Sequence, residues 1–440
     1  MSLRSITMAA AVATAFVPIS GAMAQDKTEI QWWHAMSGRL GDLLQQQVEQ
    51  FNESQDEYEV VATYKGTYSE TLNAGIAGFR AGEQPHIMQV YEVGTATMMA
   101  AKGAIKPVYQ LMEEANEPFD PNAYLAAVAG YYTTTDGEML SLPYNSSTPV
   151  LYINQQALEE AGVDPDTKPE TWPEVEELLV ELKENGVECP FTTAWQSWIH
   201  LENLSSYHNQ PFATEENGFA GVDTELVFNG ELQNKHIAML ADWADRGLFT
   251  YGGRGSDAGP LFRSGECALY TESSAGYAGV KAEAEFPFSV SSLPYWPDVE
   301  GAPYNTIIGG ASLWVMSGHD DAEYVGVAKL LSFLSSPEIQ AQWHQDTGYL
   351  PITNAAYELT KESGFYEENP GTDIAIIQMT GKEPTPNSKG LRLGSFDQIR
   401  AVINEELEMV WQGDKDPSAG LDEAISRGNQ LLRRFEQSVE

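Results

Sequence analysis

The sequence predicts an α/β fold in two lobes, each a mainly parallel sheet flanked by helices. Strand-like and helix-like segments alternate along most of the chain, which is the pattern of parallel strands connected by helices. The chain is also long. Of its 440 residues, 416 remain if a 24-residue leader is removed, and one hydrophobic core does not keep growing to that size. We therefore expect two domains.

The first 24 residues have the features of a secretory signal peptide. Arg4 supplies a positive charge, an apolar run extends from Ile6 to Phe16, and Ala22-Met23-Ala24 forms an A-x-A cleavage site. The apolar run is too short to span a hydrocarbon core of ~30 Å, which argues against a membrane anchor. Gln25, rather than a cysteine, follows the cleavage site. We expect a periplasmic protein of a Gram-negative cell without a lipid anchor.

The charge balance excludes several classes of partner. Lys and Arg number 24 against 64 Asp and Glu, a formal net charge of −40, so nucleic acid and anionic membranes are unfavourable partners. The acidic residues are spread along the chain, as in a solvated acidic coat. Such a surface repels an anionic ligand over a range of ~10 Å or less in salt. Binding of an anion then depends on a local, desolvated group of side chains.

The first third of the chain predicts a βαβαβ unit. Leu40, Leu43, Leu44, Val48 and Phe51 have helical spacing, and the residues from Tyr58 to Tyr64 are rich in β-formers. The expected strands are 29–33, 58–64 and 86–91, and the expected helices are 40–51, 68–80 and 95–102.

The remainder of the chain repeats this alternation. The clearest helix is 171–185, where Thr171 and Glu174 form a capping box, Pro173 lies in the first turn, and Gly186 can end the helix. Further strands are expected at 149–153, 189–193, 267–271 and 307–316, and further helices at 155–162, 322–334 and 421–435.

Two segments have the character of crossovers between lobes: 141–145, and 294–304, which is rich in proline and glycine. They divide the chain into one lobe made of 25–143 and 306–340 and another made of 144–305 and 341–440. Ligands of open α/β sheets bind beyond the carboxyl ends of the strands, so we expect a ligand cleft between the lobes.

Two cysteines, Cys189 and Cys267, leave two possibilities open. In an oxidising compartment they can form one disulfide, closing a loop of ~80 residues and contributing roughly 4 kcal/mol. The alternative is two buried thiols. Neither cysteine has the spacing of a metal site.

Motifs of catalysis are absent from the sequence. It contains no G-x-S-x-G, H-E-x-x-H, P-loop or dinucleotide-binding glycine pattern, and its seven histidines are scattered. We therefore expect a protein that is not an enzyme, with no cofactor and no metal.

Polar and aromatic residues instead gather at predicted strand ends and turns. Tyr68 opens a helix, Glu92 ends a strand, Ser147 lies near a crossover, and Ser273 follows a strand. Gly310 interrupts an apolar strand, where a backbone can approach a ligand closely. Trp195 and Trp198 flank a polar pair and are either packed in a core or part of the wall of a wet cleft.

Several longer segments resemble one family of receptors. They are Gln-Val-Tyr-Glu-Val-Gly-Thr-Ala-Thr-Met-Met at 89–99, Asn-Ser-Ser-Thr-Pro-Val-Leu-Tyr at 145–152, Ile-Ile-Gly-Gly-Ala-Ser-Leu-Trp-Val-Met at 307–316, Gly-Tyr-Leu-Pro-Ile-Thr at 348–353, Gly-Leu-Arg-Leu-Gly at 390–394, and Arg-Gly-Asn-Gln-Leu-Leu-Arg-Arg-Phe-Glu at 427–436. The chain resembles the periplasmic sn-glycerol-3-phosphate receptors of Ugp-type ABC importers over nearly its whole mature length.

The resemblance implies a two-lobed periplasmic binding protein fold of type II, like that of maltose-binding proteins. It also implies a monomer that closes on a small ligand by hinge motion and delivers it to the membrane permease subunits of an ABC importer. The implied phosphate contacts are Tyr68, Ser147, Ser273, Gly310, Tyr349 and Arg400, with Ser274 and Arg392 as reserves. The implied glycerol contacts are Glu92, Trp195 and Trp198.

The chemistry of these side chains agrees with such a ligand. A phosphate offers acceptors for hydroxyls, backbone N–H groups and a guanidinium, and glycerol hydroxyls suit a carboxylate. Glycerophosphocholine is a second candidate, because aromatic faces also suit a quaternary ammonium. The alternatives are a receptor of the same fold for a neutral oligosaccharide and an exported glycerophosphodiester hydrolase. The first leaves Arg400 without a role, and the second lacks a metal cluster or nucleophile–base pair in the sequence.

Overall fold

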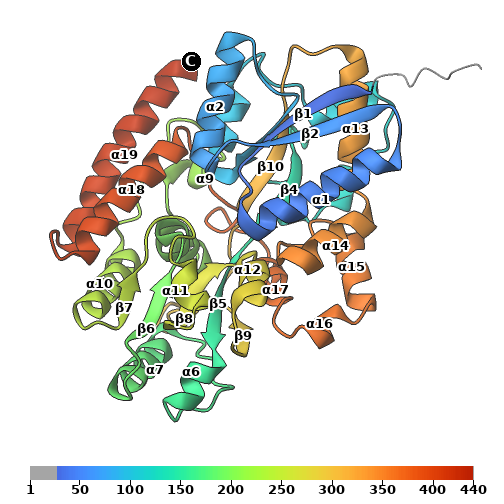
Figure 1. Cartoon of the computed structure of the whole chain (residues 1–440). Helices are drawn as coiled ribbons and strands as arrows, with labels where there is room; N and C mark the ends of the chain where they lie inside the picture. The colour runs from blue at the N-terminus through green and yellow to red at the C-terminus, as the bar shows by residue number, and fades with distance from the viewer. Residues whose placement is uncertain (1–26, 440) are drawn as a thin grey trace, which may run out of the picture.

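The computed structural model describes residues 27–439, so the expected signal peptide at 1–24 lies outside the described residues. Two five-stranded sheets with flanking helices form the two halves of the molecule, one above the other in Figure 1. Among the described residues, none of the helices has both the length and the apolar character of a membrane span.

The first sheet has the strand order β2-β1-β3-β10-β4. Its strands are β1 (Thr28–His34), β2 (Tyr58–Tyr64), β3 (Ile87–Tyr91), β4 (Leu142–Ser147) and β10 (Gly309–Val315). β1 pairs in parallel with β2 and β3, whereas β10 runs antiparallel to both β3 and β4. The strand that returns late in the chain therefore completes a sheet begun by the first third.

The second sheet has the order β7-β6-β8-β5-β9. Its strands are β5 (Pro149–Asn154), β6 (Cys189–Thr193), β7 (Phe249–Tyr251), β8 (Cys267–Ser273) and β9 (Phe288–Ser291). β6 is parallel to β7 and β8, and β5 is antiparallel to β8 and β9. Both sheets are thus mixed, because β10 and β5 enter their sheets from the opposite direction.

The helices between and after the strands fall into three groups. Those of the first half are α1 (Gly38–Ser54), α2 (Tyr68–Ala81), η1 (Glu92–Gly94), α3 (Thr95–Ala100), α4 (Val108–Glu114), η2 (Pro121–Ala123), α5 (Ala126–Ala129) and α13 (Asp321–Leu334). Those of the second are α6 (Gln155–Glu160), α7 (Trp172–Glu184), the π-helix η3 (Trp198–Asn203), α8 (Leu204–Tyr207), α9 (Thr214–Gly218), α10 (Glu231–Asp245), α11 (Gly259–Arg263) and α12 (Gly276–Glu283). The last group is α14 (Pro337–Thr347), α15 (Asn354–Glu362), α16 (Phe365–Glu368), α17 (Ile374–Thr380), α18 (Phe396–Trp411) and α19 (Pro417–Val439).

Local sequence signals fix several helix ends. Thr67 and Glu70 form a capping box at the start of α2, and Gly82 ends the helix with φ +73°. Thr171 and Glu174 form the predicted capping box of α7. Each box satisfies two backbone N–H groups that a helix start otherwise leaves without a partner.

The predicted crossover at 141–145 is wrong, because most of this segment belongs to β4. Pro143 lies on β4, an edge strand of the first sheet, which is where a sheet tolerates proline. The chain instead passes to the second sheet at Thr148, between β4 and β5. It returns between Ser291 and Gly309, a stretch that includes the predicted 294–304.

A disulfide joins Cys189 and Cys267. These are the first residues of the parallel strands β6 and β8, they are partners in the register, and their Cα atoms lie 4.5 Å apart. The bond therefore ties the second sheet together at one end. The chain-entropy model assigns a stabilisation of ~4 kcal/mol to a loop of this size.

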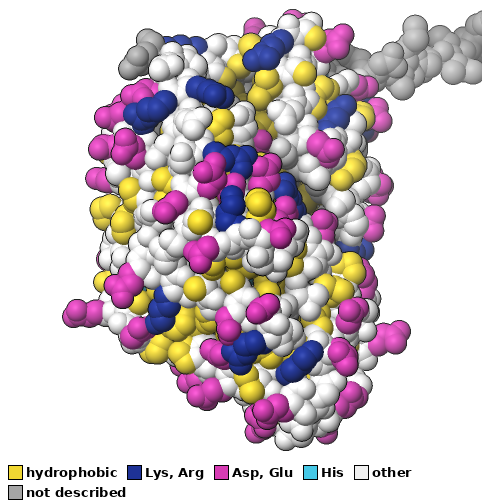
Figure 2. Space-filling view, turned by 90° about the vertical axis from the view of Figure 1, so that its left-hand side faces the viewer, with side chains coloured by type: hydrophobic (Ala, Val, Ile, Leu, Met, Phe, Trp, Pro, Cys, Tyr) yellow, Lys and Arg dark blue, Asp and Glu magenta, His cyan; other side chains and the backbone are white. Residues whose placement is uncertain are grey.

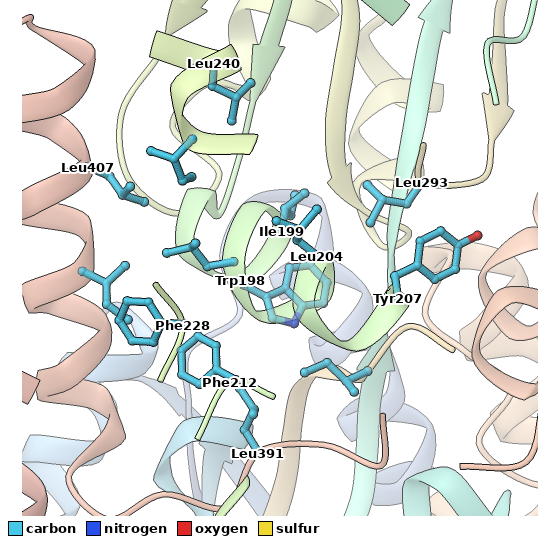
Figure 3. Close-up of a cluster of buried hydrophobic side chains, with 14 of the residues drawn as sticks. Trp198, Ile199, Leu204, Tyr207, Phe212, Phe228, Leu240, Leu293, Leu391 and Leu407 are labelled. Carbon is cyan, nitrogen blue, oxygen red and sulfur yellow. The ribbon is translucent and has the colours of Figure 1, made fainter. Parts of the chain in front are cut away.

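The hydrophobic interior extends from one half into the other. In the cluster around η3, Trp198 lies beside Ile199 and Leu204 (Figure 3). The same cluster includes Trp314 of β10, in the first sheet. By contrast, acidic side chains on the outer face shown in Figure 2 are dispersed among basic ones. The view agrees with the expected solvated acidic coat.

Candidate functional site

Hydroxyl groups from two distant segments meet beside the first sheet. Tyr68, the first residue of α2, stacks on Tyr91 with ring centroids 5.1 Å apart. The Tyr68 hydroxyl accepts a hydrogen bond of 2.9 Å from the side-chain amide of Asn145. Tyr349, which follows α14, lies against the same pair. Burial raises the pKa of Tyr349 to about 12, and hydrogen bonds with Asn145 and Tyr68 act in the opposite direction.

The junction of β4 and β10 brings backbone into the same place. Ser147 ends β4, is only 2 % exposed, and pairs in register with Gly309. Gly310 has φ +95°, and a Cβ built there would lie 1.8 Å from the backbone oxygen of Asn145. Only glycine fits this position. Here the physical reason for a glycine within an apolar strand is close backbone contact across the sheet.

Two serines follow β8 and differ in their contacts. The Ser273 hydroxyl accepts a hydrogen bond of 3.1 Å from the backbone N–H of Ala275, at the turn into α12. Ser274 is 7 % exposed, and its hydroxyl has no hydrogen-bond partner among residues 27–439. A buried hydroxyl without a partner is costly, so Ser274, the reserve residue, is the one that gains more from a ligand oxygen.

Three charged side chains from α18, η1 and η3 form a buried triad. Arg400 of α18 makes two hydrogen bonds to Glu202 of η3, at 2.9 Å from Nε and 2.6 Å from Nη2. Nη2 also lies 2.7 Å from Oε1 of Glu92, the first residue of η1. All three side chains are at most 6 % exposed. The triad joins three separate segments of the chain.

The electrostatics of the triad follow from burial and pairing. Burial raises the pKa of Glu92, and the neighbouring Arg400 opposes that shift. For Arg400, burial alone lowers the pKa, but Glu202 and Glu92 more than offset it, and the net direction is upward. The guanidinium therefore stays charged. Breaking such a pair leaves a charge in a medium that solvates it poorly.

The triad changes the expected role of Arg400. The sequence suggested a guanidinium free to face a phosphate, yet two carboxylates occupy Nε and Nη2 and leave only Nη1 outside these bonds. The sequence reasoning missed Glu202. It lies in the same π-helix as the predicted Trp198, but no local pattern marks it among the acidic residues of the chain.

The two tryptophans lie at different depths. Trp195 is half-buried, has φ +44°, and donates from its indole N–H to the Ser256 hydroxyl at 3.0 Å. Trp198 is 3 % exposed and belongs to the core cluster of Figure 3. Its ring packs against Gly309, where a Cβ would lie 2.6 Å from Cζ2. Its indole N–H has no hydrogen-bond partner among the described residues.

The site residues are connected into one network. The Arg400 guanidinium carbon lies 5.9 Å from the Tyr91 ring centroid, and Tyr91 stacks on Tyr68. Burial raises the pKa of both Tyr68 and Tyr349, and the charge of Glu92 adds a smaller shift in the same direction. The structure thus brings Tyr68, Glu92, Tyr349 and Arg400 together, with Ser147 and Gly310 linked to them through Asn145.

Arg392 has another environment. Its Nη2 donates to the backbone oxygens of Gly130, Tyr131 and Thr133, and its guanidinium lies 4.3 Å from the Phe219 ring centroid. These contacts hold the loop after α5 against the segment before α18. Nothing in them supports Arg392 as a substitute for Arg400.

One cluster of potential metal ligands lies at the opposite end of β3. His86 Nε2 is 3.5 Å from Glu323, and His319 Nδ1 is 4.0 Å from it, although the sequence showed only scattered histidines. However, the backbone N–H of Gln31 donates to His86 Nδ1 at 3.0 Å. In neutral His86 the proton is then on Nε2, the nitrogen that faces the cluster. This donor set does not fit a metal.

The chain is similar over nearly its whole length to curated periplasmic binding proteins. The sn-glycerol-3-phosphate-binding periplasmic protein UgpB of Yersinia pseudotuberculosis serotype I is 53 % identical over 412 residues, which are 93 % of this chain and 94 % of the relative. The protein of the same name from Escherichia coli O6:K15:H31 is 52 % identical over 419 residues, 95 % of each chain.

Solved structures share the fold at low identity. UgpB from Mycobacterium tuberculosis, in complex with glycerophosphocholine, aligns with a TM-score of 0.77 at 20 % identity and covers 93 % of this chain and 99 % of its own. The GacH receptor of Streptomyces glaucescens, solved unliganded and with acarbose, aligns with a TM-score of 0.76 at 17 % identity, covering 93 % and 100 %. A model of the family described as bacterial extracellular solute-binding protein matches residues 46–372. This chain belongs to the family of bacterial extracellular solute-binding proteins.

Proposed function

We propose that this protein is the solute-binding receptor of an ABC importer and captures glycerol 3-phosphate or a glycerophosphodiester. The observation that carries the proposal is its 52–53 % identity, over nearly the full chain, to periplasmic proteins named for binding sn-glycerol 3-phosphate. The geometry supports it, because hydroxyls, a carboxylate and a guanidinium from both halves of the molecule gather in one network.

The phosphate binds mainly to neutral donors in this proposal. The hydroxyls of Tyr68, Ser147 and Tyr349, either Ser273 or Ser274, and the backbone at Gly310 supply them. Neutral donors are needed because Glu202 and Glu92 already bind Nε and Nη2 of Arg400. Arg400 contributes through Nη1.

The glycerol moiety contacts Glu92, Trp195 and Trp198. A buried carboxylate accepts hydrogen bonds from ligand hydroxyls, and indole faces cover the C–H groups. The indole N–H of Trp198, which has no partner in the part of the chain that the structure describes, offers one further donor. A micromolar affinity needs ~8 kcal/mol of net binding free energy, which six or seven polar contacts with stacking can supply.

The protein acts as a monomer in the periplasm and delivers its ligand to membrane permease subunits. Its lobes follow the two sheets, so the first boundary moves from residue 143 to the end of β4 at Ser147. The lobes open and close about the passages between the sheets. The ligand drives closure through its higher affinity for the closed form.

Isothermal titration calorimetry tests the proposal on the mature protein. We expect micromolar binding of sn-glycerol 3-phosphate, or of glycerophosphocholine, and none of maltose-type sugars. Saturable binding of a sugar without binding of either phosphate ligand would contradict the proposal. Release of glycerol 3-phosphate from glycerophosphocholine, followed in a product assay, would instead indicate a hydrolase.

A further inference from the structure

Carboxylates outnumber guanidinium groups in the buried triad. Glu92 and Glu202 both face the single guanidinium of Arg400. Glu202 is only 1 % exposed and engages Arg400 with both carboxylate oxygens. A bidentate pair of this kind neutralises the guanidinium before any ligand arrives.

Other charged groups nearby do not reverse the balance. Asp397, one turn before Arg400 on α18, accepts a hydrogen bond from the Tyr91 hydroxyl and so adds negative charge. Glu272 lies beside Ser273, with a pKa raised to about 7 by burial. Arg392, the next cation, is bound to three backbone oxygens. The buried tyrosines stay neutral, because burial raises their pKa values above 10.

We propose that Glu202 is a specificity-determining residue that limits the charge of the bound ligand, so that the site takes up phosphate esters as singly charged anions. The inference rests on the proposed function and deepens it. A buried site in which two carboxylates face one guanidinium opposes a second negative charge on the ligand far more than water does. A phosphodiester keeps one negative charge at every pH near neutrality, and a phosphomonoester has one only below its second pKa of ~6.

A comparison of two ligands isolates this effect. Calorimetric dissociation constants are measured from pH 5.5 to 8 for sn-glycerol 3-phosphate and for its methyl diester, which keeps a single charge. Any titration of protein groups enters both series equally, so the ratio of the two constants reports the ligand's own ionisation. We expect glycerol 3-phosphate to weaken relative to the diester by about tenfold per pH unit above ~6.

The variant Glu202→Gln removes one negative charge at nearly constant shape. At pH 8 the affinity of this variant for glycerol 3-phosphate, relative to the methyl diester, should be at least tenfold higher than that of the wild type. Glu202→Asp keeps the charge, so it should retain the wild-type pH dependence of this ratio. Glu406→Gln is the matched control, because Glu406 is also buried on ion pairs, with Lys415 and Arg427, but outside the triad.

The outcomes separate the two proposals. A ratio that stays constant within twofold from pH 5.5 to 8, or a Glu202→Gln protein with the wild-type slope, would overturn the charge limit and leave the proposed function intact. Absence of binding of both ligands at every pH would overturn both. If Glu202→Gln does not fold, Glu92→Gln removes the same charge from the other side of Arg400, and its ratio should flatten in the same way.

Discussion

Ser69 donates a hydrogen bond of 3.0 Å to Asp397, and this bond joins the first turn of α2 to the first turn of α18. α2 packs on strands of the first sheet, and α18 packs on α10, which contacts β7 of the second. The Tyr91 hydroxyl donates to the same carboxylate. Asp397 therefore connects elements of the two halves of the molecule.

Ser69→Ala should weaken the contact between the two halves of the molecule. The lost hydrogen bond is worth about 1 kcal/mol, so ligand affinity should fall about threefold to tenfold. Small-angle X-ray scattering should show a larger radius of gyration without ligand. Ser54→Ala is the control, because the Ser54 hydroxyl donates only to Phe51 within its own helix. Equal affinities for the two variants would contradict a closing role for Ser69.

Arg400→Ala should destabilise the protein as well as prevent binding. Removal of the guanidinium leaves Glu92 and Glu202 buried without a cation, at a cost of ~3–5 kcal/mol. Urea denaturation measures the loss. The triple variant E92Q/E202Q/R400M removes all three charges and should be closer to wild type in stability, although it should not bind. A fully stable Arg400→Ala protein would show that the triad contributes little.

Gly310→Ala should lower both stability and affinity. The new Cβ meets the backbone oxygen of Asn145, and φ at this position is +95°. Gly103→Ala separates the two causes, because Gly103 has φ +76° but open space around the new Cβ. The control should lose about 1 kcal/mol from backbone strain alone, and Gly310→Ala should lose more. Comparison of the two unfolding curves is the measurement, and equal losses would contradict the steric argument.

Glu272 should make stability depend on pH. Burial raises its pKa from 4.5 to about 7, so the folded protein binds a proton more tightly than the unfolded chain. Its neutral form therefore stabilises the fold at low pH, and this contribution falls by ~3 kcal/mol as the pH rises from about 4.5 to 7. Glu272→Gln stays neutral, so the difference in unfolding free energy between wild type and variant should follow that curve. A difference that is constant with pH would refute the shift.

Reduction of the disulfide should weaken the second half of the molecule. Cys189→Ser combined with Cys267→Ser removes the link between β6 and β8, at a cost of ~4 kcal/mol by the chain-entropy model. Thermal unfolding of the double variant, compared with the wild type with and without reductant, checks this. The reduced wild type and the variant should unfold at similar temperatures.

The sequence determined the local structure and the family. Periodicity and capping residues located β2, α2, α7 and β6 to within one residue at each end, because these signals act between neighbours in the chain. The crossover predicted at 141–145 falls within β4 instead, because the pairing of a strand with a distant strand such as β10 cannot be inferred from the strand's own residues.

Tertiary structure alone decided which charges and hydroxyls meet. Glu92, Glu202 and Arg400 come from segments more than 100 residues apart, and nothing local distinguishes Glu202 from the other acidic residues of this chain. Likewise, the buried position of Trp198, the pairing of the two cysteines and the lack of a partner for the Ser274 hydroxyl within residues 27–439 depend on packing between elements. The sequence specifies residue types and their spacing, but burial and the pairing of charged groups arise only when distant segments pack together. Burial and pairing in turn determine the charge of the site.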